Sequence, residues 1–125
     1  MNLLLDSHTL IWLLSDPNKI RPEALDVMQR SSNALFFSAA SVWELELKSS
    51  KGKLRLPESW IQAAFEIGIS ELAITADACL KSTRLPWHHK DPFDRLLFAQ
   101  TLEHKLIFAT RDGFAALYGI PVLKV

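Results

Sequence analysis

Short apolar segments, each long enough for one buried β-strand, recur along this sequence. The clearest cover residues 2–5, 34–37 and 106–109, and weaker ones cover residues 71–74 and 121–123. Strands of this length that are apolar throughout are typical of parallel sheets, in which helices cover both faces. Helical patterns separate these segments. The sequence therefore predicts an α/β fold with three layers, α/β/α, around a central parallel sheet of about four to five strands.

The helices are predicted from their starting residues, because Ser, Thr, Asp and Pro stand where several helical patterns begin. We expect helices over residues 7–14, 22–31, 39–49, 57–67, 76–82, 92–104 and 112–118. No internal repeat or linker interrupts this alternation, so residues 1–125 are expected to form a single domain. The composition, 49% hydrophobic and 22% charged, is that of a folded protein with a substantial core.

The charge balance excludes a protein that is basic overall, because 14 Lys and Arg residues match 14 Asp and Glu residues. Nucleic-acid binding would therefore need a local basic patch or bound metal ions. The apolar start of the chain is too short to span a bilayer, so we expect a cytoplasmic protein without membrane contact. Cys79 has no partner for an internal disulfide and is expected to be a small buried residue.

Three aspartates are expected at one edge of the sheet. Asp6 follows the first predicted strand, Asp112 follows the strand at residues 106–109, and Asp94 lies in the first turn of a predicted helix. The ends of parallel strands and the starts of the following helices line the edge where ligands usually bind. Taken singly, Asp6, Asp91 and Asp112 are better explained as helix caps, which is the commoner role of Asp at such positions.

Glu44 is harder to explain as a local structural residue. It shares one helical face with Ala40, Trp43 and Leu47, so the carboxylate lies on an apolar stripe. A buried carboxylate needs a cation or a strongly shifted pKa. A salt bridge to Arg95 or Arg111 is the structural alternative to a metal ion. Four converging acids would favour Mg²⁺ or Mn²⁺, as one or two ions, because hard cations prefer oxygen ligands.

Several stretches together resemble the PIN-domain family, and within it the VapC toxin ribonucleases of bacterial toxin–antitoxin pairs. They are LLLDSH (residues 3–8), SAASVWEL (38–45), HHKDPFDRLL (88–97) with the following Ala99 and Gln100, ATRD (109–112) and YGIPVL (118–123). They span nearly the whole chain in the order of the family. Thr101, Lys105 and Glu46 depart from its usual residue types, but none of them is one of the four acids.

The resemblance implies that Asp6, Glu44, Asp94 and Asp112 are catalytic and bind the metal. Asp91 and Thr110 are secondary candidates, the first also as a helix cap and the second also as a turn-stabilising hydroxyl. The resemblance further implies an endoribonuclease in which a metal-activated water attacks an RNA phosphodiester in line. It implies a homodimer and a small cognate antitoxin as partners.

Basic and aromatic residues give weaker indications. Lys48, Lys51, Arg95 and Arg111 are candidates for RNA binding, and Lys53 and Arg55 extend the basic run; a solvated surface is the simpler interpretation of that run. His88 and His89 are expected to orient a loop. Most of the aromatic residues Trp12, Trp43, Trp60 and Phe65 are expected in the core, although some could form a groove for a partner helix.

Two other functions remain open at this point. A metal-dependent phosphatase on a similar sheet would explain the first aspartate, but one such superfamily has a second Asp where this chain has His8, and Glu44 would have no role. A catalytically inactive PIN-like module that binds RNA or protein is the other alternative. Such a module is expected to have lost some of its acids, whereas all four are present here.

Overall fold

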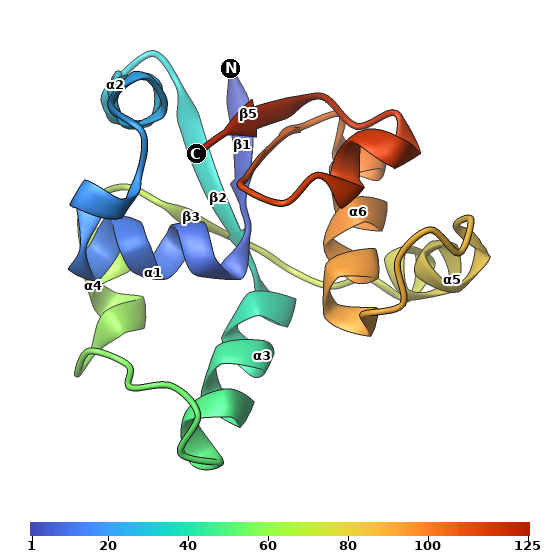
Figure 1. Cartoon of the computed structure of the whole chain (residues 1–125), viewed down its shortest axis with the longest axis horizontal. Coiled ribbons are helices and arrows are strands. Elements are labelled where there is room, and N and C mark those ends of the chain that lie inside the picture. Colours follow the sequence, from blue (N-terminus) through green and yellow to red (C-terminus); the bar gives the residue numbers. More distant parts are fainter.

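The computed structural model describes all residues from Met1 to Val125. Its centre is a sheet of five parallel strands in the order β3-β2-β1-β4-β5 (Figure 1). The strands are β1 (Asn2–Leu5), β2 (Ala34–Ser38), β3 (Ser70–Leu72), β4 (Ile107–Thr110) and β5 (Val122–Lys124). The predicted parallel sheet is confirmed, and all five expected strands are present.

Six α-helices and two short 3₁₀ helices connect the strands. They are α1 (Ser7–Ser15), η1 (Pro17–Lys19), α2 (Pro22–Gln29), α3 (Ala39–Ser50), α4 (Trp60–Glu66), α5 (Ala76–Arg84), α6 (Pro92–His104) and η2 (Phe114–Tyr118). The prediction that a helix begins at Pro57 is wrong, because Ser59 has a φ of 54° and a left-handed residue cannot continue an α-helix. Between α1 and α2 the chain forms η1, which begins at Pro17.

The two faces of the sheet are covered by different cores. Leu3 and Leu5 of β1 are fully buried among residues of α1, α2 and α4, whereas Leu4 between them is buried with residues of α6 and the C-terminal segment. Successive side chains of a strand point to opposite faces, so this division places helices on both sides of the sheet. Figure 1 shows α1, α2 and α4 on one side and α5 and α6 on the other, as the predicted three layers require.

Several side chains expected in the interior lie at the surface. Trp43 is 62% exposed and packs edge-on against Phe93, and Phe65 is 44% exposed. Cys79 is also exposed, because only one side of the short helix α5 faces the protein. Trp60 is buried as expected, and its indole N–H donates to Glu46 at 2.9 Å. None of the helices is long and apolar enough to span a membrane.

Candidate metal centre and active site

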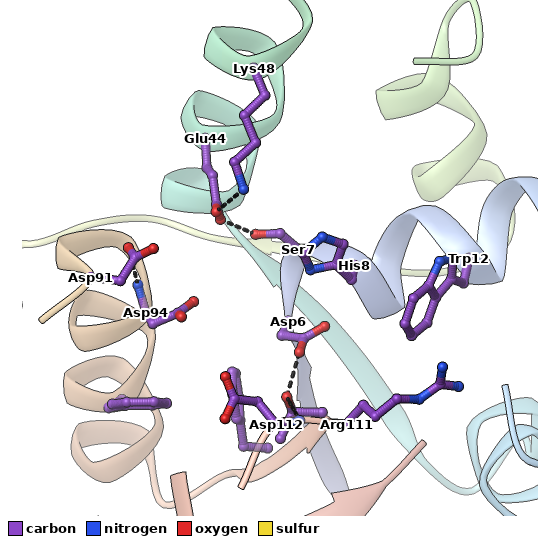
Figure 2. Close-up of a pocket in the computed structure, with 13 residues that line it drawn as sticks. Asp6, Ser7, His8, Trp12, Glu44, Lys48, Asp91, Asp94, Arg111 and Asp112 are labelled. Atoms are coloured by element: carbon purple, nitrogen blue, oxygen red, sulfur yellow. Dashed lines mark hydrogen bonds and ion pairs between the residues drawn. The ribbon is translucent and has the colours of Figure 1, made fainter. Parts of the chain in front are cut away.

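The carboxyl ends of three strands deliver the acidic residues to one place. Asp6 directly follows β1, β2 leads into the helix that carries Glu44, and β4 ends two residues before Asp112. Asp94 lies in the first turn of α6, which packs against α3. Figure 2 shows the four carboxylates arranged around one space.

This space is a cavity of about 360 Å³ that is open to solvent. Five carboxylates line it, those of Asp6, Glu44, Asp91, Asp94 and Asp112, together with Ser7, His8, Trp12, Lys48, Phe98, Phe108, Thr110 and Arg111. Only two permanent cations, Lys48 and Arg111, face these five acids, so the cavity concentrates negative charge in a chain of zero formal net charge. Such a cavity attracts cations.

Asp6 and Asp112 are linked through Thr110. The Asp6 Oδ1 accepts from the backbone N–H of Thr9 at 2.7 Å and so caps α1, while Oδ2 accepts from the Thr110 hydroxyl at 2.5 Å. The same hydroxyl oxygen accepts from the backbone N–H of Asp112 at 3.1 Å. Thr110 is 1% exposed, and it therefore fixes the positions of the first and last acids relative to each other.

Glu44 is buried as the helical pattern predicts, with 4% of its surface exposed. Its Oε1 accepts from the Ser7 hydroxyl at 2.6 Å and its Oε2 from the Lys48 ammonium at 2.8 Å. The suggested partners Arg95 and Arg111 are wrong, since Lys48 lies one helical turn away on α3 and reaches the carboxylate directly. The hydrogen bond with Glu44 raises the pKa of Lys48.

Asp94 is the acid with the most strongly perturbed ionisation. Burial raises its pKa to about 6. The hydrogen bond to His89, whose Nε2 lies 2.7 Å from Oδ2 of Asp94, opposes this rise, and the negative charges of Asp91 and Glu44 add to it. His89 was expected only to orient a loop, and the structure adds a direct contact between its ring and a site carboxylate.

Asp91 and Asp112 each combine a structural and a site position. Asp91 caps α6, since its Oδ1 accepts from the backbone N–H groups of Phe93 at 2.8 Å and Asp94 at 3.3 Å. The Oδ1 of Asp112 accepts from the backbone N–H of Phe114 at 2.9 Å. The prediction that Asp91 is a helix cap is therefore confirmed. The side chains of Asp91 and Asp112 also line the cavity.

The two arginines proposed for RNA binding differ in their surroundings. Arg95 is 2% exposed and donates to the main-chain carbonyls of Ser82, Leu85, Pro86 and His89, so it cannot reach a phosphate in the cavity and its assignment to RNA binding is wrong. Arg111 lines the cavity. Its guanidinium lies over the Trp12 ring, 4.4 Å from the centroid, and donates to the carbonyls of Lys19 and Val125.

The donor set fits a hard divalent cation, because it consists mainly of carboxylate oxygens. One ligand atom each from His89, Asp94 and Asp112 lies within 4.8 Å of the other two. Ligand atoms on opposite sides of one Mg²⁺ are about 4.2 Å apart, so the carboxylates of Asp94 and Asp112 would fit around a shared ion.

Comparisons with known proteins show which proteins this chain is similar to in sequence and in fold. The chain is 28% identical over 114 residues to ribonuclease VapC22 of Mycobacterium tuberculosis, covering 88% of this chain and 86% of that protein. Among solved structures, a chain of VapBC2 from Rickettsia felis, crystallised with a DNA fragment from its promoter, superposes with a TM-score of 0.70 at 12% identity. The match covers 99% of this chain and 98% of that one.

A chain of VapBC-1 from nontypeable Haemophilus influenzae has a TM-score of 0.65 at 18% identity, with 99% and 98% of the two chains covered. At these identities the superpositions show a shared fold. The sequence profile of the PIN domain matches residues 3–117, which is nearly the whole chain and includes all four acids. By fold and by sequence, this chain belongs to the PIN domain family.

Proposed function

We propose that this chain is a divalent-metal-dependent endoribonuclease and the toxin of a toxin–antitoxin pair that acts in the cytoplasm. The observation that carries the proposal is the convergence of Asp6, Glu44, Asp94 and Asp112 on one cavity. Its similarity to ribonuclease VapC22 supports RNA as the substrate. An inactive module would not need four acids held in one place, since their mutual repulsion has a cost without a cation.

The residues of the chain prepare the site for its ion and substrate. Ser7 and Lys48 hold Glu44, and Thr110 holds Asp6, so the carboxylates are oriented before a ligand arrives. Mg²⁺ or Mn²⁺, as one or two ions, would supply a water of lowered pKa and stabilise negative charge on the phosphate. Asp91 is a secondary candidate for metal binding, because its Oδ1 is already occupied by the hydrogen bonds that cap α6.

RNA cleavage with Mg²⁺ or Mn²⁺, with and without EDTA, tests this function. Asp6→Asn and Asp112→Asn are expected to lose at least about 100-fold in activity, as removal of electrostatic stabilisation typically does. Asp26→Asn is the matched control, because Asp26 lies on α2 in an exposed ion pair with Arg30. Cleavage that survives EDTA, or full activity in both site variants, would refute the function.

A basic groove beside the metal cavity is the proposed path of the RNA backbone. Lys48, Lys51 and Lys53 line this groove of about 250 Å³, and it shares Glu44, Lys48 and Asp91 with the cavity. Phosphate contacts dominate nucleic-acid affinity and make it depend on salt. Arg111, on another side of the cavity, is the remaining candidate for a phosphate contact.

Binding of single-stranded RNA to an Asp6→Asn background, which leaves the RNA intact, tests this path. Lys51→Glu combined with Lys53→Glu is expected to weaken binding and to reduce the salt slope by about 0.7 per lost phosphate contact. Lys124→Glu is the control, because Lys124 is an exposed residue of β5 outside the groove. An unchanged salt slope in the double variant would exclude the groove.

The proposed partners are a second copy of the chain and a small antitoxin. The VapBC complexes among the structural relatives support the antitoxin. Exposed apolar side chains, including Trp43 at 62% and Leu117 at 57%, offer contact area for either partner. Co-expression with the product of an adjacent small gene, followed by light scattering with and without it, tests both. A monomer that captures no such product would refute this proposal.

A further inference from the structure

We infer that His89 is a positioning residue for the metal ligand Asp94, an inference that rests on the proposed metal-dependent function. Its Nε2 lies 2.7 Å from Oδ2 of Asp94, and both side chains are largely buried, with 17% and 28% exposed. An ionised carboxylate only accepts hydrogen bonds, so the tautomer with a proton on Nε2 donates to it. Fixing one carboxylate oxygen also fixes the direction of the other.

Asp94 depends on this contact more than Asp6 or Glu44 depends on any single partner. Asp6 has two partners, Thr9 and Thr110, and Glu44 also has two, Ser7 and Lys48. For the side chain of Asp94, the bond to His89 is the one hydrogen bond within the chain. Without it, the repulsion from Asp91 and Glu44 would act on an unrestrained carboxylate.

The imidazole of His89 is itself held in place from two sides. Its ring stacks on Phe114, with centroids 4.2 Å apart and planes 12° from parallel, and leans against Phe98 at 6.0 Å. Its backbone N–H donates to the Tyr118 hydroxyl at 2.9 Å. A histidine that served only to fill space in the loop would not need this many contacts converging on its ring and main chain.

Arg95 anchors the loop that carries His89. Its buried guanidinium donates to the His89 carbonyl at 3.0 Å and to the Pro86 carbonyl at 2.9 Å, and the Trp87 ring covers it at 3.6 Å from the centroid. Arg95 follows Asp94 directly on α6. The same turn of helix therefore holds both the metal ligand and the anchor of the residue that orients it.

Mn²⁺ binding to the RNA-free protein, measured by calorimetry or electron paramagnetic resonance, tests this role without relying on activity. Loss of an outer contact to a ligand typically weakens metal binding 10–100-fold, so His89→Ala is expected to weaken Mn²⁺ and Mg²⁺ binding by about that factor. His89→Gln keeps an N–H donor near the position of Nε2 and is expected to restore most of the loss. Circular dichroism confirms that each variant is folded.

His88→Ala is the matched control, because His88 is the neighbouring histidine and its ring contacts Tyr118 edge-on at 5.2 Å. It is expected to bind Mn²⁺ within about twofold of wild type, well below the 10–100-fold loss of an outer contact. A His89→Ala protein that binds Mn²⁺ as tightly as wild type would overturn the inference and leave the proposed function intact. A wild-type protein that binds no Mn²⁺ would overturn both.

Direct coordination by His89 is the outcome that would replace the positioning role. An imidazole ligand favours Co²⁺ and Ni²⁺ over Mn²⁺ and Mg²⁺. In that case His89→Ala would weaken Co²⁺ and Ni²⁺ binding far more than Mn²⁺ binding, and His89→Gln would restore nothing. Equal losses for all four ions, with rescue by glutamine, support the positioning role.

Discussion

Asp94 is expected to destabilise the metal-free protein at neutral pH. Burial raises the pKa of its carboxyl from 3.8 to about 6, because an ionised group loses its hydration when the chain folds. The folded state therefore binds this proton more tightly than the unfolded state. Replacing Asp94 by asparagine, which does not ionise, should remove the penalty and make the metal-free protein more stable.

The size and sign of this effect follow from the two pKa values. A difference of about two pH units corresponds to about 3 kcal/mol, and partial hydration of the exposed part of the side chain reduces this to about 1–3 kcal/mol. Because the pKa is higher in the folded state, stability falls as the pH rises from about 4 to about 6. The full penalty of Asp94 ionisation is present above that window.

Urea denaturation in EDTA at pH 4.5 and pH 7.5 measures the effect. Asp94→Asn is expected to be more stable than wild type at pH 7.5 by about 1–3 kcal/mol, and the difference should shrink at pH 4.5. Added Mn²⁺ should stabilise wild type and narrow the gap, because the ion binds the folded state. The exposed Asp26→Asn should change stability by less than about 0.5 kcal/mol at either pH.

Two results would refute this reasoning. One is an Asp94→Asn protein that is no more stable than wild type at pH 7.5 in EDTA. The other is a stability gain of the same size at both pH values, because a gain unrelated to ionisation would not follow the titration of the carboxyl. The first result would mean that the hydrogen bond from His89 adequately stabilises the ionised carboxylate, and the second that the gain has a cause other than ionisation.

Four further substitutions test the structural supports of the site and of the helix that carries Glu44. Thr110→Val should cost about 1–2 kcal/mol in urea denaturation and lower RNA cleavage, because it leaves the Asp112 N–H without its acceptor and releases Asp6; unchanged cleavage would contradict the role of the hydroxyl. Arg95→Lys should cost about 3 kcal/mol or more, because an ammonium cannot reproduce the planar fork that contacts four carbonyls; wild-type stability would contradict it. Trp60→Phe should lower the free energy of unfolding by about 1 kcal/mol, because the indole N–H bond to Glu46 is lost. Adding Glu46→Gln to the Trp60→Phe variant should recover none of this loss.

The strands and most helices could be predicted because they follow from local patterns. Apolar runs of three or four residues marked the strands, and the burial of Glu44 followed from its helical face. Its partner Lys48 was predictable as well, since an acid and a lysine four residues apart on a helix are neighbours. The predicted salt bridge from Glu44 to Arg95 or Arg111 was wrong because Lys48 is nearer on the same helix.

The environment of His89 could not be predicted from local patterns. Its position depends on the Tyr118 hydroxyl, 29 residues away in sequence, and on an arginine whose partners are main-chain carbonyls. Every residue has a main-chain carbonyl, so the residue types of a sequence do not indicate which carbonyls will accept a hydrogen bond. For the same reason Arg95, which is adjacent to a site carboxylate in sequence, suggested a phosphate contact although its side chain points into the loop.

The choice between helix cap and metal ligand, which the sequence left open for three aspartates, is not exclusive. A carboxylate has two oxygens, and Asp91 uses Oδ1 for the cap of α6 while its side chain lines the cavity. Asp6 caps α1 with Oδ1 and reaches Thr110 with Oδ2. Helix starts carry positive partial charge, so capping also favours the ionised form that a cation requires. The backbone bonds that begin the helices therefore help to assemble the proposed metal site.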